Sequence, residues 1–295
     1  MSRDSGVSTR GRRIRIGVGL AAAMTIAVPC ALFAASWITV NDLTPRRLRT
    51  LAGKGDRMLV VTAHPDDEIV MAGTLAIAAA SGASVALHCF TRGEASRSAQ
   101  WRGRTGADQI GAAGLADIRH EELRRSAAAL GLGSVSIGTW VDGTLASHVD
   151  ELVQELEGVI REWRPTLVVS LDDALGLYGH PDHVASAAAA RRAVLGARAA
   201  GHGLRLFQAT LPTRQVSLAR RFSPVFQRAS AEAGATPPTP TTCVSIARAA
   251  RRKLAAIDAH ATQRAVMQDV QPLLGTIPRP LYFRVFSREY FARVL

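Results

Sequence analysis

The sequence predicts an α/β fold, with a Rossmann-like, mostly parallel sheet that is covered by helices on both faces. Short Val-rich apolar runs, such as residues 58–63 and 166–171, have the composition of strands buried on both faces. Ala- and Leu-rich segments alternate with these runs, as helices do between parallel strands. The chain has 295 residues, of which 47% are hydrophobic and 20% charged, so it is long enough to bury a sizeable core.

The predicted elements alternate along the chain from residue 58 onward. Strands are predicted at 58–63, 84–91, 135–138, 166–171, 205–210 and 281–286. Helices are predicted at 67–81, 119–130, 152–163, 182–195 and 246–263. Gly82 and Gly131 end the first two helices and Pro165 ends the third, as Gly and Pro commonly do. Residues 92–117 and 214–242 are predicted to be long irregular segments.

The N-terminal 40 residues differ in composition from the rest of the chain. Residues 16–40 carry no charge, and Arg residues precede them. This run is longer than the roughly 20 residues that span a bilayer, and longer than the signal-peptide core of about 7–15 residues. We therefore expect residues 1–40 to be a signal anchor, with a cleaved signal peptide as the alternative. Residues 41–57 are expected to be a basic linker to a domain at 58–295.

This N-terminal segment predicts where the protein resides. Basic residues before an apolar span favour an N-terminus inside the cytoplasm. We therefore expect a membrane-anchored or exported protein whose catalytic domain lies outside the cytoplasm and which contacts the membrane through residues 16–40.

Composition argues against some other classes of protein. The formal net charge is +12, but the basic residues are scattered and only 5% of residues are aromatic. A nucleic-acid-binding protein more often has a concentrated basic stripe or base-stacking aromatic residues, so nucleic acid is not an expected partner. The three Cys residues show no CxxC spacing, so neither a thiolate zinc cluster nor a redox pair is predicted.

Two similar motifs follow two of the predicted strands. His-Pro-Asp-Asp occupies residues 64–67, and His-Pro-Asp-His occupies residues 180–183. In a parallel sheet of this kind the active site lies beyond the carboxyl ends of the strands, so the two motifs are expected to face each other. Imidazole and carboxylate groups from both motifs could then bind one metal ion. Three protein ligands with an open fourth position form the arrangement of a catalytic zinc site.

These two motifs closely resemble those of the PIG-L/LmbE-like deacetylases. That family includes the N-acetylglucosaminyl-phosphatidylinositol de-N-acetylases and the deacetylases of mycothiol metabolism. The resemblance continues in Thr-Arg-Gly-Glu at 91–94, Arg-His-Glu-Glu-Leu at 119–123, Asp-Gly at 142–143, and a C-terminal helix pattern that contains His260. It covers about residues 58–265 and implies the LmbE-like deacetylase fold.

The resemblance implies a metal centre with a neighbouring base. His64, Asp67 and His183 would bind one Zn²⁺ per chain, although a site with two His and one Asp can also hold Fe²⁺ or Co²⁺. Asp66 would be the general base that takes a proton from the metal-bound water. Neutral His and ionised Asp are needed for metal binding, so activity is expected to fall on acidification.

The resemblance also implies roles for five further residues. His180 would stabilise the oxyanion of the tetrahedral intermediate, and Tyr178 would assist it there. Asp182 would orient a catalytic His. Arg119 and Asp142 would contact the sugar or its neighbouring group.

The expected activity is therefore that of a metal-dependent hydrolase that removes an N-acetyl or other N-acyl group from an amino sugar or glycoconjugate. One alternative is an amidase that cleaves a larger amide, such as a thiol-sugar conjugate. Another is a non-catalytic, membrane-anchored glycan-binding protein of the same fold. Two residues near the motifs have structural alternatives: a first-turn carboxylate that complements the helix dipole for Glu68, and a packing residue for His260.

Overall fold

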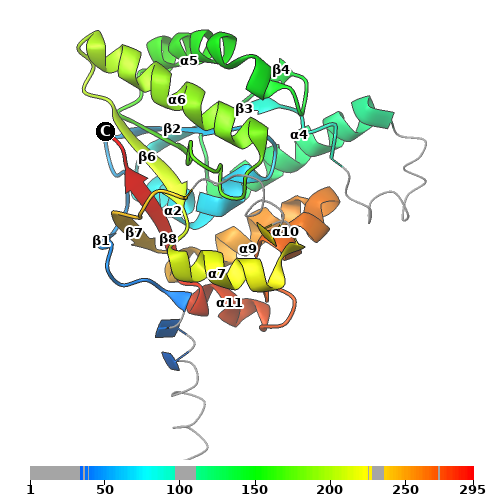
Figure 1. Cartoon of the computed structure of the whole chain (residues 1–295). Helices are drawn as coiled ribbons and strands as arrows, with labels where there is room; N and C mark the ends of the chain where they lie inside the picture. Colours follow the sequence, from blue (N-terminus) through cyan, green and yellow to red (C-terminus); the bar gives the residue numbers. More distant parts are fainter. Residues whose placement is uncertain are drawn as a thin grey trace, which may run out of the picture.

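A mixed sheet forms the centre of the molecule. The structure is a computed structural model that describes residues 34–35, 37–38, 40–96, 111–224, 226–227, 236–271 and 273–295. In this part of the chain the sheet has eight strands, in the order β1-β7-β8-β6-β5-β2-β3-β4 (Figure 1). The strands are β1 (Arg46–Leu48), β2 (Arg57–Thr62), β3 (Ser84–Thr91), β4 (Ser134–Trp140), β5 (Leu167–Leu171), β6 (Arg205–Thr210), β7 (Thr242–Ser245) and β8 (Arg288–Arg293).

Most strand pairs in this sheet are parallel, which confirms the predicted fold class. β2 pairs in parallel with both β3 and β5, and β6 continues the parallel part next to β5. Among the described strands, β8 alone runs antiparallel to its neighbours β6 and β7. The chain passes from β2 to β3 and β4 on one side and later returns to β5 on the other. The strand order therefore reverses between β2 and β5, and open α/β sheets bind their ligands at such a point.

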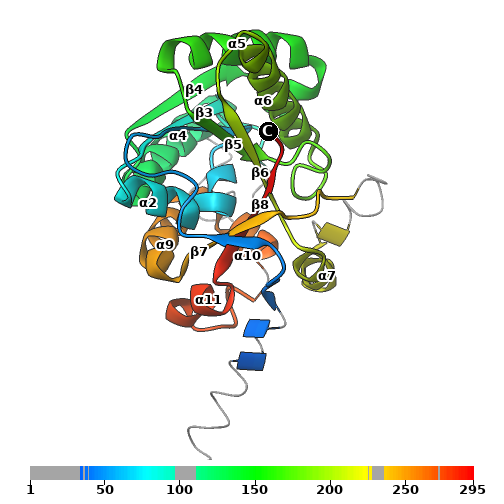
Figure 2. The same ribbon diagram turned by 90° about the vertical axis from the view of Figure 1, so that its left-hand side faces the viewer.

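Helices cover both faces of the sheet (Figure 2). α5 and α6 lie on one face, while α2, α4 and α9 lie on the other. The helices are α2 (Ala72–Ala80), α4 (Gly111–Leu130), α5 (Val149–Trp163), α6 (Pro181–Ala199), α7 (Thr213–Phe222), α9 (Ala250–Ala259), α10 (Arg264–Val270) and α11 (Arg279–Val285). A short 3₁₀ helix, Asp67–Met71, precedes α2.

Strand β2 shows why a continuous apolar run forms a strand here. Met58 and Val60 belong to the core cluster on the α2 face, whereas Leu59 and Val61 belong to the cluster on the α6 face. Successive side chains of a strand point to opposite faces, so a strand with helices on both sides needs apolar residues at every position.

One predicted element near the C-terminus is wrong. Residues 281–286 are predicted to be a strand, but they belong mostly to α11, and the strand β8 follows it. Periodicity cannot separate a strand from a buried helix in so short an apolar run. Pro lies in the first turn of α11, where its missing N–H costs nothing, and Tyr282 and Phe283 are buried.

The other differences concern the long irregular segments. α7 begins at Thr213 and occupies the first part of the predicted irregular segment 214–242, with Val216 and Ala219 on its buried side. The helix predicted at 119–130 already begins at Gly111, and residues 97–110 of the predicted loop lie outside the described residues. The segment 41–57, expected to be a linker, contributes the edge strand β1, which pairs in parallel with β7.

The expectation of a membrane-anchored or exported protein is corrected. Among the described residues, no helix is both long and apolar enough to cross a bilayer. The predicted span at 16–40 lies mostly outside the described residues. Its described end packs on the domain, because the indole N–H of Trp37 donates to Ser287 Oγ at 2.7 Å and Val40 is buried.

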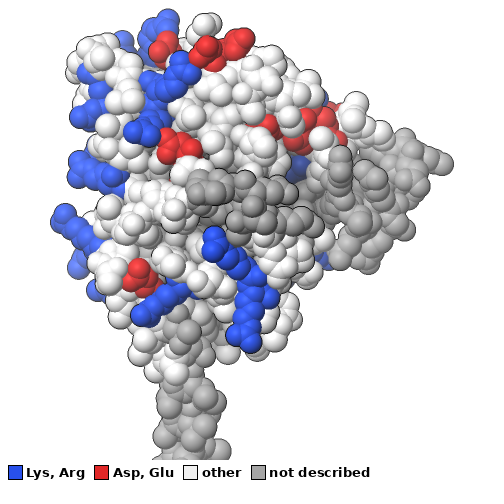
Figure 3. Space-filling model, in the orientation of Figure 1, with Lys and Arg blue, Asp and Glu red and all other residues white. Residues whose placement is uncertain are grey.

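The basic side chains on one face of the molecule are visible in Figure 3. Lys and Arg lie there in several separate groups, along one edge and over the lower part, with white and red areas between them. This distribution agrees with the scattered basic residues of the sequence.

Candidate metal centre

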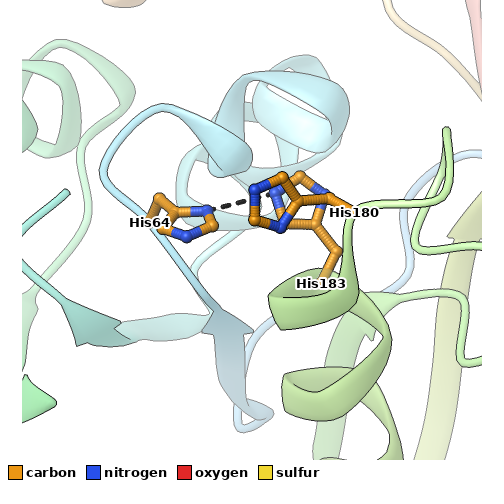
Figure 4. Close-up of side chains that lie close together, drawn as sticks. All are labelled: His64, His180 and His183. Atoms are coloured by element: carbon orange, nitrogen blue, oxygen red, sulfur yellow. Dashed lines mark hydrogen bonds between the residues drawn. The ribbon is translucent and has the colours of Figure 1, made fainter. Parts of the chain in front are cut away.

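The two His-Pro-Asp motifs lie side by side at the point where the strand order reverses. Residues 64–67 follow β2, and residues 180–183 form the start of α6 after β5. His180 is the N-cap of α6, and its Nδ1 accepts a hydrogen bond of 3.2 Å from the backbone N–H of Asp182. The imidazole rings of His64, His180 and His183 converge (Figure 4). The sequence-based expectation that the motifs face each other is therefore correct.

Three of the converging side chains have the spacing of metal ligands. His183 Nε2 lies 3.2 Å from His64 Nδ1 and 3.0 Å from Asp67 Oδ1. The distance from His64 Nδ1 to Asp67 Oδ2 is 3.7 Å. Ligands about 2.0–2.1 Å from a tetrahedral zinc ion would be roughly 3.3 Å apart, so these atoms fit around one ion. All three side chains are buried.

The surroundings fix the orientation of two of these ligands. His183 Nδ1 lies 3.0 Å from the carbonyl oxygen of Gly176, so Nδ1 carries the proton and donates it, which leaves the Nε2 lone pair directed at the centre. Asp67 Oδ2 accepts hydrogen bonds from the backbone N–H groups of Ala63, at 3.1 Å, and His64, at 2.8 Å. Backbone groups of the loop before α6 and of the turn after β2 therefore fix the orientation of both candidate ligands.

The other nitrogen of His64 faces two carboxylates. His64 Nε2 lies 2.9 Å from Asp142 Oδ1 and 3.2 Å from Asp182 Oδ2. Burial opposes a charge on this ring, but the hydrogen bonds to Asp142 and Asp182 outweigh it and raise the pKa of His64 to about 10. The site thus favours positive charge at this position, and a divalent cation bound beside Nδ1 would supply it.

Asp182 occupies a fully buried position behind His64. It accepts hydrogen bonds from the backbone N–H groups of Gly143, at 2.7 Å, and Leu145, at 3.1 Å. Burial raises the pKa of this carboxyl, but the hydrogen bond to His64 and the bond from Gly143 outweigh it, so the pKa is lowered. The side chain of Asp182 thus contacts His64, a candidate ligand, while only its backbone N–H contacts His180.

Asp66 lies between the candidate ligands and a buried arginine. Its backbone has φ = 111°, a left-handed value that non-glycine residues adopt rarely and mostly where function requires it. Burial raises the pKa of Asp66 to about 6; the charge of Arg119 opposes this shift and the charge of Asp67 adds to it. A carboxylate with a pKa in this range is ionised at pH 7 and still basic enough to accept a proton.

Arg119 is built into the wall of the site. Its Nη1 donates to the carbonyl oxygen of Gly93 at 2.6 Å, and its Nη2 donates to the carbonyl oxygen of Pro65 and lies 3.3 Å from Asp66 Oδ1. The side chain is buried, and its Nε has no hydrogen-bond partner among the described residues. Arg119 therefore holds the turn that carries Asp66.

These residues surround an open cavity of about 370 Å³. Its wall includes every candidate site residue except Asp182, which lies behind His64.

The ring of His180 stacks on that of His183 with centroids 4.8 Å apart, and the ring of Tyr178 meets His183 edge-on at 5.1 Å. Burial and the neighbouring His183 and His64 lower the pKa of His180 to about 4, so this ring is neutral at pH 7. Burial raises the pKa of the Tyr178 hydroxyl, which therefore keeps its proton.

A buried polar pair behind Asp66 was not predicted as part of the site. Glu68 Oε1 lies 2.6 Å from His260 Nε2 and accepts a hydrogen bond of 2.5 Å from Ser126 Oγ. Glu68 Oε2 accepts a bond of 3.0 Å from the backbone N–H of Asp66. The sequence contains Glu68 within the first motif, but nothing in the pattern links it to a residue 192 positions away.

Comparison with known proteins places the chain in a family. The PIG-L family model, described as GlcNAc-PI de-N-acetylase, matches residues 59–194. A protein of Saccharomonospora viridis named 1D-myo-inositol 2-acetamido-2-deoxy-alpha-D-glucopyranoside deacetylase is 33% identical over 253 residues, which cover 76% of this chain and 91% of that protein. The chain belongs to the PIG-L family. This membership confirms the resemblance in the motifs, and the described fold agrees with it.

The extent of the similarity differs among relatives of this PIG-L protein. A protein of the same name from Thermobifida fusca is 37% identical over 147 residues, which span 43% of this chain but only half of that relative. The N,N'-diacetylchitobiose deacetylase of Pyrococcus horikoshii has a similar structure, with a TM-score of 0.55, 23% identity, and coverage of 81% of this chain and 84% of that one. The 4-carboxy-2-hydroxymuconate hydratase GalB of Pseudomonas putida has a TM-score of 0.57 at 21% identity and covers 81% of this chain and 96% of that one. The fold therefore supports more than one reaction, and the chemistry has to be inferred from the site.

Proposed function

We propose that this protein is a zinc-dependent hydrolase that removes an N-acetyl group from an amino sugar or its glycoconjugate. The observation that carries the proposal is the convergence of His64, Asp67 and His183 beside Asp66 in an open polar cavity. The relative from Saccharomonospora viridis supports the substrate class, because its name states the deacetylation of a 2-acetamido sugar linked to inositol.

The proposed metal ligands and the proposed base have different roles in the reaction. A zinc ion held by His64, Asp67 and His183 would polarise the amide carbonyl and lower the pKa of a water that it binds. Asp66 takes the proton from the attacking water and delivers it to the amide nitrogen as the C–N bond breaks. The products are a carboxylic acid and a free amine, and Asp66 is ionised again at the end.

The remaining site residues support these steps. His180 is neutral and faces the cavity, so its ring can donate a hydrogen bond to the carbonyl oxygen as negative charge develops there. One such donor is typically worth about 2.7–4 kcal/mol. Tyr178 keeps its proton and can donate to the same oxygen. Asp142 and Asp182 hold the ring of His64, and Arg119 holds Asp66.

Contacts to the sugar are assigned to the polar part of the cavity. Ser96 and Gln263 line the cavity, and Ser96 Oγ donates to Gln263 Oε1 at 2.9 Å. Arg119 and Asp142 also border it, so their proposed contact with the sugar or its neighbouring group is compatible with their structural bonds.

The proposal is tested on the purified full chain. We expect about one equivalent of bound zinc, together with acetate release from N-acetylglucosamine derivatives that stops when a chelator removes the metal and returns when zinc is restored. Bound metal without acetate release from any N-acetylated sugar would contradict the proposed activity. Failure to bind zinc, Fe²⁺ or Co²⁺ would contradict the proposed metal centre.

A further inference from the structure

A second cavity lies next to the first. It has a volume of about 110 Å³ and is bordered by the 3₁₀ helix after β2, the loop after β5, and helices α7, α10 and α11. Much of its lining is apolar. The apolar and aromatic residues include Ile69, Leu177, Ala219, Val270, Tyr282 and Phe283.

The two cavities meet at the candidate base. Asp66 borders both of them. Leu177 borders the apolar cavity while the next residue, Tyr178, borders the metal cavity. Likewise, Met267 borders the apolar cavity while its neighbour Val266 borders the metal cavity. A ligand whose reacting carbon lies beside Asp66 is therefore close to both the polar and the apolar cavity.

Lys253, Glu289 and Asp66, which border the apolar cavity, are each paired with an opposite charge. Lys253 Nζ lies 2.6 Å from Glu289 Oε1, and both side chains are buried. Asp66 is paired with Arg119, whereas Arg288 donates to the backbone carbonyl of Asp42 at 3.0 Å and has no ion pair among the described residues. A cationic ligand group would find no free carboxylate among these residues, whereas a hydrocarbon group would be removed from water at no such cost.

We propose that the apolar cavity receives the hydrocarbon chain of the substrate's acyl group, so that the enzyme prefers a short N-acyl amino sugar to the N-acetyl form. This inference rests on the proposed function. The reacting amide has two substituents: the sugar hydroxyls suit the polar cavity around Ser96 and Gln263, and the acyl chain suits the apolar one. A buried cavity of about 150 Å³ can bind benzene, so 110 Å³ has room for a chain of about four carbons.

The first test compares hydrolysis of N-pentanoylglucosamine and N-acetylglucosamine by the zinc-loaded full chain. Each buried methylene contributes about 0.8 kcal/mol, so kcat/KM for the pentanoyl substrate is expected to be at least tenfold higher. Ala219→Leu fills the cavity from α7 and should bring the ratio of the two kcat/KM values close to one. Ser217→Leu adds the same side chain at an exposed position of α7 and should leave the ratio unchanged. Val270→Phe fills the cavity from α10 and replaces Ala219→Leu if that variant does not fold.

A binding measurement separates this inference from the proposed function. Calorimetry on the zinc-loaded Asp66→Asn protein, which is expected not to turn over, should give at least tenfold tighter binding of the pentanoyl amide than of the acetyl amide. A tenfold binding preference supports the acyl-chain cavity even if the native protein hydrolyses neither sugar. Absence of hydrolysis would overturn the proposed activity and not the cavity. Equal binding of the two amides, or an undiminished preference in both filled variants, would overturn the acyl-chain cavity while leaving acetate release as the test of the activity.

Discussion

At the scale of single residues, Asp66 has the properties expected of a proton acceptor. It is buried, its pKa is raised to about 6 by that burial, and its left-handed backbone is held by Arg119 and Glu68 on either side. The pKa of its neighbour Asp67 shifts in the opposite direction. Burial raises it, but the electrostatic and hydrogen-bond interactions with His183 and His64 outweigh burial and lower it. The surroundings thus give two adjacent carboxyl groups the different properties expected of the proposed base and the proposed metal ligand.

Replacing Asp66 by Asn should remove the base and leave the ligands. We expect kcat to fall by about a hundredfold to ten-thousandfold, the usual contribution of general base catalysis, while the zinc content stays near that of the native protein. Steady-state kinetics and metal analysis of the same preparation check this. Turnover close to the native rate would show that another group accepts the proton.

The pair of Glu68 and His260 predicts a stability effect. Glu68→Gln removes a carboxylate that is fully buried and paired with His260 at 2.6 Å. Breaking a buried pair usually costs about 3–5 kcal/mol, because the remaining charge has no partner. We expect the free energy of unfolding in urea to fall by this order.

Glu121→Gln is the matched control for Glu68→Gln. It removes the same group from the exposed surface of α4, where the effect should stay within about 0.5 kcal/mol. Similar losses in the two variants would show that the Glu68–His260 pair does not stabilise the fold.

At the scale of elements, the loop after β3 and helix α4 act on the site through one contact. Gly93 follows β3 with φ = 69°, and a Cβ placed there would lie 2.3–2.8 Å from the guanidinium group of Arg119. That group is fixed by Pro65 and Asp66 and cannot withdraw freely. The loop therefore requires Gly93, because a side chain there would displace Arg119 of α4 from its contacts with the turn after β2.

Gly93→Ala should consequently reduce activity more than stability. A displacement of about 1 Å in a positioned catalytic group can cost a hundredfold in rate, and we expect a loss of kcat/KM of about that size. Gly55→Ala is the control, since Gly55 has φ = 89° but no neighbouring atom within 4 Å of its Cβ position. Both variants carry the strain of a positive φ, so Gly93→Ala should lower Tm at least as much as Gly55→Ala, while only Gly93→Ala should impair catalysis. Equal activities would contradict the role assigned to this contact.

The predicted elements also differ in how well local sequence specifies them. Strand β3 has the predicted bounds, and β6 does as well, because their apolar runs are bounded by polar or Gly residues. α11 was predicted to be a strand, since its seven residues are too few to show a helical period. Its helical state depends on packing of Tyr282 and Phe283 into the core, which local pattern does not contain.

At the scale of the whole molecule, buried ionisable pairs make stability depend on pH. Burial raises the pKa of Glu68, but His260 outweighs it and lowers that pKa below the ordinary 4.5. This carboxylate stabilises the fold above pH 4.5, and its contribution is lost as pH falls through the lowered value. For His260 burial lowers the pKa, but Glu68 outweighs it and raises the value above 6.5. The contribution of His260 is complete below pH 6.5 and is lost as pH rises through the raised value.

The pair therefore predicts greatest stability between about pH 4.5 and 6.5. Urea unfolding of the native chain should give a lower free energy of unfolding at pH 3.5 and at pH 8.5 than at pH 5.5. The lowered pKa values of Asp142 and Asp182 add to the loss on the acid side. Glu68→Gln should flatten the pH profile, and an unchanged profile in that variant would assign the dependence to other groups.

The sequence by itself determined the fold class, the family and the identity of the converging residues. These follow from local patterns: strand-like runs, helix stops, and two motifs placed just after strands that a parallel sheet brings to one edge. The tertiary structure alone decided that Arg119 and Glu68 hold Asp66, that His260 pairs with Glu68, and that an apolar cavity adjoins Asp66. Those contacts join segments far apart in the chain, and their energies come from burial and packing, which no local pattern specifies.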